Sequence, residues 1–549
     1  MARKFATRVW ALLLTAVLLV GLVGCGEKAP NETTAGNKET NAPESTSGSG
    51  ETQEPTTEAP VEITYPLESD YTIWLWGINN LKYQSVYNDA SESPFHTGLS
   101  KMTGMKINWE FPQDGVKADQ AFSLIMMEEK KPDIIFHSIL PETAEEYITD
   151  GVLYDLTEYL PKYAPDYWEY ITSDPAIDAM AKTSTGKYYR FLSCVESEYN
   201  TTYMGPLIRK DWLDECKLDI PVTLEDWENV LRTFKSKYGA TFTATKGQFG
   251  LGAGTGAYAD DTALWYVDNG EVKFANTTPE YKEYLTVLNR WYAEGLMDAD
   301  ISVNDASAVR NKAVNGEVGI VYGPSSVFRN MVADAEKAGN GAEWIGISHP
   351  RTAKGDATTY IQTNASFASQ KAAVVTTSCP EEHLIDVLKF LNYGYTEEGR
   401  MYWNFGEKGV SYELDANGKP VWTEKVLSEG AEAYKRYQLT SAAGISIQAK
   451  EFIELLNPGA FGEAIDAWIE NSVAKQHTIP RLSLTEDESA QYTDKYGAIK
   501  TYADETIAEF IFGERSLDEF DDYVKKLESM GLEDCRKVQQ AAYDRYLAQ

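Results

Sequence analysis

Few side chains in this sequence are spaced for covalent catalysis. Carboxylates are abundant, with 84 Asp plus Glu in 549 residues, but no local motif forms the pair, about 5–9.5 Å apart, that glycoside hydrolysis needs. The sequence contains no G-x-S-x-G nucleophile elbow, no H-E-x-x-H zinc motif and no Walker A loop. The glycine-rich run Gly250–Gly256 lacks G-x-G-x-x-G spacing and predicts a flexible loop. We therefore expect no catalytic residues, with an enzyme as one alternative.

Metal ligands are equally poorly placed. None of the five cysteines forms a C-x-x-C pair, and only five histidines are present, so the usual zinc spacing is missing. Asp298, Asp300 and Asp305 are spaced somewhat like calcium ligands, but a solvated loop is the better interpretation. We expect no metal and no cofactor. The sequence leaves open whether one or two disulfides form among Cys194, Cys216, Cys379 and Cys535.

The sequence contains many more side chains that can bind a ligand non-covalently. The sequence has 13 Trp, 34 Tyr and 19 Phe; aromatic rings can cover the C–H faces of a sugar, while polar side chains pair with its hydroxyls. Open α/β sheets present such side chains beyond the carboxyl ends of their strands. That rule selects Trp76, Asn79, Asn80, Glu196, Tyr203 and Tyr322. We add Trp265 and Trp403 as aromatic candidates; core packing is the alternative for each aromatic residue.

Two further aromatic side chains near these candidates are interpreted differently. Trp74 lies two positions from Trp76 on the same predicted strand, so both face one side, and we expect Trp74 in the core. His137 is expected to be satisfied locally at a strand end. The net charge of −34 disfavours nucleic acid and anionic membrane surfaces as partners.

The first residues carry an export address. Arg3, Lys4 and Arg8 precede the 14-residue apolar run Trp10–Val23, which is too short for a membrane span of about 20 residues and fits a signal-peptide core. The run ends in Leu22-Val23-Gly24-Cys25, which resembles the bacterial lipobox. We expect a signal peptide over 1–24, lipidation of Cys25, and an anchor on the extracytoplasmic face of a Gram-positive-like cell membrane.

Composition then separates a tether from a folded part. Residues 25–62 are rich in Thr, Glu, Pro, Ser and Gly without an aromatic residue, which predicts a disordered tether. From residue 63 to 549 strand and helix patterns alternate and indicate an α/β fold. Strands are expected at 71–76, 106–111, 131–136, 318–322, 344–348 and 372–376.

Several helix ends are readable. Thr223 and Asp226 form a capping signature before an apolar stripe, and Thr278 followed by Pro279 opens a second helix. Ser378 with Glu381 predicts the cap of a third helix. Together these signals predict a large α/β protein on a lipid tether.

Scattered segments of the chain resemble the family 1 extracellular solute-binding proteins, and more closely their large lipoprotein branch. The resemblance spans roughly residues 70–549, and its order and spacing make it specific. The pieces are Ile208–Leu213, Pro221–Trp227, Tyr281–Leu285 leading to Trp291–Leu296, Asn315–Ile320, and Asn404–Tyr412 running into Asp415–Pro420. In this family such proteins are the substrate-binding components of ABC importers.

The resemblance implies a two-lobed, periplasmic-binding-protein-like fold of type 2 with a helical C-terminal extension, whose hinged lobes close over a ligand. Mapped here, lobe 1 covers about 63–190 and 350–392, and lobe 2 about 200–346 and 400–549. The crossings fall near Tyr188–Tyr203, Ile347–Arg351 and Leu391–Arg400. Arg209, in a family motif, is either a ligand contact or a lobe-closing ion pair. Some relatives carry a calcium loop, but Tyr238–Lys246 lacks its carboxylates.

The implied function is delivery of a carbohydrate, and more specifically an oligosaccharide, to the permease subunits of an ABC importer by a monomeric, membrane-anchored protein. The alternatives are a surface lipoprotein that binds peptides or another non-sugar solute, and a carbohydrate-active enzyme. The sequence alone does not identify the ligand or the permease.

Overall fold

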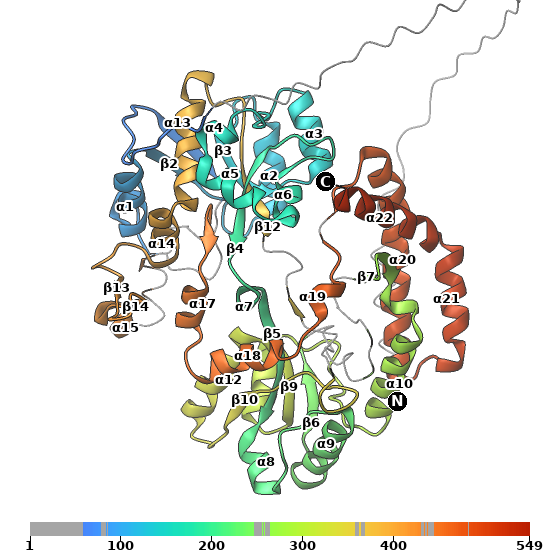
Figure 1. Ribbon diagram of the computed structural model, residues 1–549. Helices are drawn as coiled ribbons and strands as arrows, with labels where there is room; N and C mark the ends of the chain where they lie inside the picture. Colours follow the sequence, from blue (N-terminus) through green and yellow to red (C-terminus); the bar gives the residue numbers. More distant parts are fainter. Residues whose placement is uncertain are drawn as a thin grey trace, which may run out of the picture. The chain divides into compact units, whose positions relative to one another are not determined.

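The chain divides into two units, 1–56 and 57–549, and the described residues belong to the second. The computed structural model describes residues 59–77, 84, 86–245, 255, 257, 264–356, 362–363, 368–429, 433, 436–437, 444–480 and 482–548 (Figure 1). The expected signal peptide, Cys25 and most of the tether therefore lie outside the described residues.

A six-stranded sheet organises the first part, with strand order β15-β4-β12-β3-β1-β2. Neighbours pair in parallel except β12, which runs antiparallel to both β3 and β4. The strands are β1 (Thr72–Trp76), β2 (Lys106–Glu110), β3 (Ile134–Ser138), β4 (Arg190–Val195), β12 (Ala368–Val375) and β15 (Ile447–Gln448). The strands expected near 71–76, 106–111, 131–136 and 372–376 are thus confirmed, with β3 shifted toward the C-terminus.

Alternation along the strands sends side chains to two separate cores. Ile73 and Leu75 of β1 pack with one set of helices, whereas Ile135 of β3 packs with α2 and α3 on the other face. The first set includes α1 (Pro94–Thr103), α4 (Leu160–Tyr163), α5 (Pro165–Thr172), α6 (Pro175–Ala181), α13 (Glu381–Asn392) and α14 (Glu397–Phe405). The second comprises α2 (Ala118–Met127) and α3 (Pro141–Thr149).

A second sheet has the strand order β10-β5-β9-β6, with β11 also pairing with β5. Its strands are β5 (Thr202–Arg209), β6 (Thr241–Ala244), β9 (Val318–Pro324), β10 (Trp344–Gly346) and β11 (Gln362–Thr363). The helices next to them in the sequence are α8 (Lys210–Cys216), α9 (Leu224–Tyr238), α11 (Ala306–Val314) and α12 (Ser325–Ala338). The strands expected at 318–322 and 344–348 are confirmed as β9 and β10.

The predicted helix caps have different outcomes. Thr223 and Asp226 form the capping box of α9, and the Thr278 side chain accepts from the Tyr281 N–H at the start of α10 (Pro279–Ala293). The predicted Ser378 cap is wrong, because α13 begins after Pro380 without a side-chain cap. Ser378 instead accepts a hydrogen bond from the Lys131 N–H at 3.0 Å, a long-range contact that local spacing does not reveal.

Helix α18 (Ala460–Ile469) lies unusually close to the second sheet. Gly205 of β5 leaves room for the Trp468 ring, since a Cβ there would come within 2.5 Å of it. Gly346 of β10 leaves room for Ala464 in the same way. The Trp468 indole N–H donates to the Pro206 carbonyl at 3.0 Å, which fixes the helix on β5.

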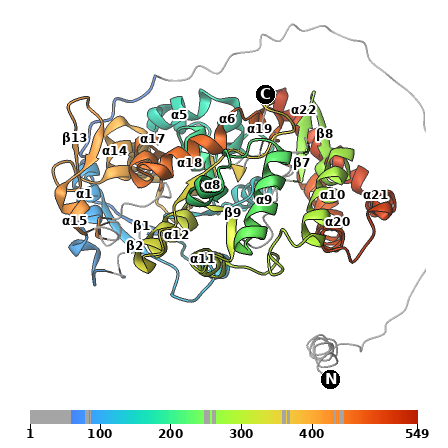
Figure 2. The same ribbon diagram turned by 90° about the horizontal axis from the view of Figure 1, so that it is seen from below.

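The C-terminal helices complete a large core with α10. They are α20 (Glu486–Phe512), α21 (Phe520–Ser529) and α22 (Leu532–Leu547). Leu285 of α10 shares a buried cluster with Phe510 of α20 and Leu527 of α21. Both views show these helices gathered beside the hairpin of β7 (Trp265–Asp268) and β8 (Glu271–Phe274) (Figure 1, Figure 2). They form the helical C-terminal extension of this two-lobed α/β fold.

The chain passes between the two sheets three times. β4 leads through α7 (Glu198–Thr201) into β5, as Figure 1 shows. In the order of the described elements, β11 is followed by β12, and β15 leads into α17 (Lys450–Leu456) and α18. The last passage therefore follows Gln448, not Leu391–Arg400 as expected, because Ile447 pairs with Cys194 of β4. Trp403 and Ile445 likewise belong to a core of the first sheet. The remaining elements are β13 (Tyr412–Leu414), β14 (Pro420–Trp422), α15 (Glu424–Glu429) and α19 (Ala474–His477).

Cys194, Cys216, Cys379 and Cys535 are all free thiols, so they form no disulfide with one another. Within the described ranges, no helix combines the length and apolar character that crossing a bilayer requires.

Candidate functional site

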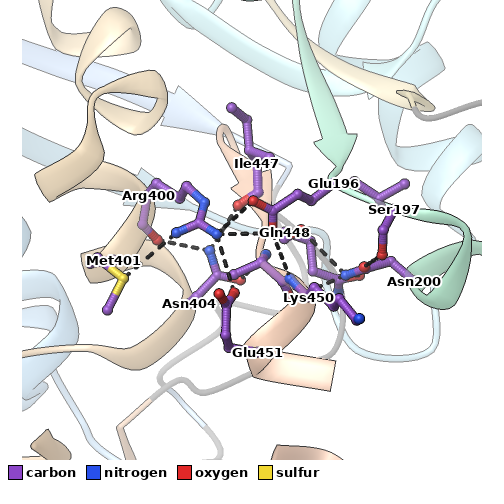
Figure 3. A network of polar contacts seen from close by, with 12 residues as sticks. Glu196, Ser197, Asn200, Arg400, Met401, Asn404, Ile447, Gln448, Lys450 and Glu451 are labelled. Atoms are coloured by element: carbon purple, nitrogen blue, oxygen red, sulfur yellow. Dashed lines mark hydrogen bonds and ion pairs between the residues drawn. The ribbon is translucent and has the colours of Figure 1, made fainter. Parts of the chain in front are cut away.

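A polar network joins two of the passages between the sheets (Figure 3). Glu196, the residue after β4, receives two hydrogen bonds from Nη2 of Arg400, at 2.8 and 2.9 Å. The same carboxylate accepts from the Lys450 N–H at 2.7 Å, and Arg400 reaches Glu451 at 3.3 Å. Arg400 of α14 therefore connects the start of the first passage with the start of α17 in the last.

Two asparagines hold the backbone of the last passage from either side. The Asn404 side chain donates to the Ile447 carbonyl at 2.8 Å and accepts from the Ala449 N–H at 2.9 Å. Asn200 of α7 donates to the Ala449 carbonyl at 3.1 Å. Because Asn404 is buried, its backbone partners have no access to replacement water.

Two carboxylates, Glu196 and Glu451, face the single guanidinium of Arg400 in this network. Burial acts to lower the pKa of Arg400, but the neighbouring Glu196 and Glu451 carboxylates outweigh it and raise that pKa. The guanidinium side chain is 13% exposed and the Glu196 side chain 39% exposed. The arrangement can fix the geometry of the two passages.

The carboxyl edge of the first sheet carries the next candidates. Trp76 ends β1 and is buried against Ile135 and Tyr189, whereas Trp74 is half-buried and donates to Glu110 at 2.7 Å. The expectation that Trp74 is the core residue is therefore wrong, and Trp76 takes that place. Asn79 and Asn80 lie outside the described residues.

His137 is satisfied locally, as expected. Its ring stacks on Phe122 with centroids 4.3 Å apart, and Nε2 lies 3.4 Å from Asp119 Oδ1. Burial lowers the pKa of His137, against a smaller opposing effect of Asp119.

The corresponding edge of the second sheet carries Tyr203 and Tyr322. Tyr203, near the start of β5, is 36% exposed. Tyr322 of β9 is fully buried and lies edge-on to His349, with centroids 5.8 Å apart. Burial lowers the pKa of His349 to about 3, so this imidazole is neutral at physiological pH.

Arg209 lies at the opposite end of β5 from Tyr203. Arg209 is six positions further along the strand, which corresponds to about 20 Å. Arg209 donates to both carboxylate oxygens of Asp211, at 2.8 and 2.6 Å, and its guanidinium stacks over Trp212 at 4.0 Å. Of the two expected roles, an ion pair is observed, but within one lobe.

Trp265 and Trp403 also lie in cores. The Trp265 indole donates to the Tyr492 hydroxyl at 2.8 Å, which ties β7 to α20. Trp403 packs against Phe95 with centroids 5.4 Å apart. The structure thus brings Glu196 and Trp403 to the α14 region, places Trp76 and Tyr322 at different sheet edges, and leaves Trp265 beside the C-terminal helices. Ligand contact by each of these residues remains a prediction.

Asp298 is buried, which contradicts the interpretation of its segment as a solvated loop. Lys312 Nζ lies 2.7 Å from both Asp298 oxygens, and Asn304 donates to the same carboxylate at 2.7 Å. Asp305 instead caps α11. The lysine thus supplies the positive charge at this carboxylate, and no group of three or more potential metal ligands occurs among the described residues.

Sequence reasoning missed Arg400, Asn200 and Asn404 as the residues that hold the passages. Their partners lie tens to hundreds of residues away, so only the resemblance in the segment beginning at Asn404 pointed to this region. A separate hollow, lined by residues such as Thr183, Ser483 and Arg545, lies at neither sheet edge.

Two α/β sheets joined by repeated chain passages define the class of two-lobed solute-binding folds. The sequence profile of the family "Bacterial extracellular solute-binding protein" matches residues 86–401, and the chain belongs to this family. Its place of action is accordingly extracytoplasmic.

Curated relatives extend the likeness over most of the chain. Lipoprotein LipO of Bacillus subtilis (strain 168) is 25% identical over 487 residues, covering 83% of this chain and 91% of LipO. The fructooligosaccharide ABC transporter substrate-binding protein FusA of Streptococcus pneumoniae is 22% identical, covering 88% and 92%. The polygalacturonan/rhamnogalacturonan-binding protein YtcQ of B. subtilis is 22% identical, covering 79% and 84%.

A solved structure shows the same fold. The HMO-binding solute-binding protein of Bifidobacterium longum infantis superposes with a TM-score of 0.69 at 18% identity, covering 86% of this chain and 99% of that one.

Proposed function

We propose that this protein is a lipid-anchored receptor that binds an oligosaccharide between its two lobes and delivers it to an ABC importer. The observation that carries the proposal is topological. The carboxyl end of β4 runs through α7 directly into the start of β5, so this passage links the carboxyl edge of one sheet to the corresponding edge of the other. Ligands of open α/β sheets bind beyond such edges.

Carbohydrate is the favoured solute class because of the relatives. FusA and YtcQ are named for a fructooligosaccharide and for galacturonan-type polysaccharides. Among the predicted aromatic contacts, Tyr203 is the most accessible in the described structure, and its ring can cover a sugar face. Trp76 and Tyr322 are proposed as buried walls that support the binding edges.

The remaining elements of the proposal concern anchoring, partner and turnover. Lipidation of Cys25 would hold the chain at the membrane, and permease subunits of the importer would receive the ligand from a monomer. We propose binding without catalysis, since Glu196 and Glu451, the carboxylates of the network, both pair with Arg400 instead of facing a reacting group.

A thermal-shift screen of the full chain against mono- and oligosaccharides tests the proposal. A ligand that binds only the folded form raises the melting temperature, and chromatography of the same mixtures should show the ligand unchanged. Peptides form the comparison set, and a response to peptides with none to glycans would contradict the carbohydrate assignment.

A matched pair of variants then tests the location. Tyr203→Ala should weaken the affinity for the ligand at least tenfold. Val303→Ala, at another exposed apolar residue (69%), should leave that affinity unchanged. Trp76→Ala is a poor probe, because removing a buried tryptophan destabilises a protein by about 3–5 kcal/mol regardless of ligand.

A further inference from the structure

Recognition of an acidic sugar has a specific chemical requirement. Each uronate residue carries a carboxylate, and a guanidinium with a free pair of N–H groups is the side chain best shaped to bind one. The arginines that are buried or nearly buried in the described structure are the natural candidates: Arg190, Arg209, Arg351 and Arg400.

Two of these arginines already pair with carboxylates. Arg400 pairs with Glu196 and Glu451. Arg351, beyond β10, pairs with Glu470 at 2.9 Å and donates to Ser348 at 3.1 Å. The described residues offer no acceptor to the Arg351 Nε–H, but the Nη2 group beside it is already engaged by Glu470 and Ser348, so that edge of the guanidinium is not free to take a carboxylate with both donors.

The other two arginines are engaged inside the lobes. Arg190 donates to the backbone carbonyls of Met180 and Ile139, at 2.6 and 3.3 Å. Arg209 uses its fork on Asp211. Binding a uronate through any of the four would require breaking a contact that the protein makes with itself.

The surrounding charge also opposes an acidic ligand. The whole chain carries −34, and at the carboxyl edge of the first sheet Asp119 has a side chain that is 93% exposed. Lys371 lies at the same edge, opposite Ser138, but one ammonium does not match the repeated carboxylates of a polyuronate. Lys82 and Lys246, which follow β1 and β6 in the sequence, lie outside the described residues.

We infer that the ligand is a neutral oligosaccharide, recognised by aromatic and uncharged polar groups, and not one built of uronic acids. This inference rests on the proposed function and narrows its solute class.

Isothermal titration of the full chain against two probe sets tests it. The neutral set contains fructo-, galacto-, malto-, xylo- and manno-oligosaccharides, and the acidic set contains oligogalacturonides and oligoalginates, each at 50 and 300 mM NaCl. The expected result is that one neutral probe binds at least tenfold more tightly than every acidic probe, with a Kd that salt does not change.

The possible results distinguish a wrong choice of oligosaccharide class from a wrong proposed function. An oligouronide that binds within tenfold of the best neutral probe, with an affinity that falls as salt rises, overturns the inference while oligosaccharide binding stands. If neither set binds, the proposed function itself fails.

A gain-of-binding variant tests whether the pairing of Arg351 with Glu470 disfavours acidic sugars. Glu470→Gln removes the carboxylate from Arg351 and should improve oligogalacturonide binding at least threefold without changing the neutral Kd. Glu424→Gln makes the same charge change at the start of α15 and should improve neither. An unchanged oligogalacturonide affinity in Glu470→Gln contradicts the role assigned to Arg351.

Discussion

Arg400 donates hydrogen bonds to both carboxylate oxygens of Glu196, which lies 204 positions earlier in the sequence. Glu196 leaves the first sheet at the end of β4, and its carboxylate also accepts from the backbone of Lys450 at the start of α17 (Figure 3). The Arg400 side chain of α14 therefore fixes the first passage between the sheets relative to the last one. The predictions below start from this contact.

A double-mutant cycle on Glu196→Ala and Arg400→Ala should give a coupling energy of about 1 kcal/mol in the free energy of unfolding. The guanidinium is largely buried, which strengthens the charge-assisted pair, while the partly exposed carboxylate limits it. Denaturant titration measures the four proteins. The exposed pair Lys500–Asp504 serves as control and should couple by less than about 0.5 kcal/mol. Equal coupling in both pairs would contradict a special role for Arg400.

Asn404→Ala should destabilise the protein by about 2–4 kcal/mol, because it leaves the Ile447 carbonyl and the Ala449 N–H without their buried partner. Hydrogen exchange should show the Ala449 amide losing protection ahead of the sheet core. Asn417→Ala, in the exposed turn between β13 and β14, should change stability by no more than about 0.5 kcal/mol. A neutral outcome for Asn404→Ala would mean that water replaces both bonds.

Lys312→Met should cost about 3 kcal/mol at neutral pH, since it strands the Asp298 carboxylate in a buried position. Burial acts to raise the pKa of Asp298, but hydrogen bonds led by that from Lys312 hold it below its usual value. Asp298 therefore stabilises the fold above about pH 4 and loses that effect as pH falls through its lowered pKa. The difference between variant and wild type should be largest above pH 5 and shrink toward pH 3, as followed by denaturation at each pH.

His349 should make stability fall as pH drops below about 6.5. Burial keeps the pKa of His349 at about 3 in the folded state, whereas an unfolded histidine titrates near 6.5. Between these values the unfolded chain binds the extra proton, so stability decreases by up to about 1.4 kcal/mol per pH unit from this residue.

His349→Phe should remove that part of the slope between pH 6.5 and 5. The control is His383→Phe, at a half-buried ring stacked on Tyr71, which should leave the slope unchanged. The same slope in both variants would assign the acid sensitivity elsewhere.

Local signals in the sequence predict local structure well. Strand-like composition located β1 and β9, period-two alternation located β2, and the Thr223 capping box appears as expected, because each depends on residues within one turn or strand. Ser378 failed as a cap since Lys131, 247 residues away, uses its hydroxyl. Rules of strand ends likewise selected Trp76 and Tyr322 but could not show that both would be buried.

Contacts between residues that are far apart in the sequence could not be predicted, for the same reason. Nothing near Arg400 in the sequence marks its partners, and Lys312 gives no local sign that it will neutralise Asp298 fourteen residues earlier. Family resemblance supplied the two-lobed fold, while the position of the last passage needed the pairing of β15 with β4.

The two residues of β15 carry a consequence for biogenesis. Synthesis begins at the N-terminus, yet the outermost strand of the first sheet arrives only at residue 448, after about four fifths of the polypeptide. While the whole second sheet is made, the first sheet thus lacks both β12, which lies between β4 and β3, and β15 at its edge. Nascent chains halted before this point should be prone to aggregation, and a ribosome-bound fragment ending at 440 should remain protease-sensitive where one ending beyond 470 does not.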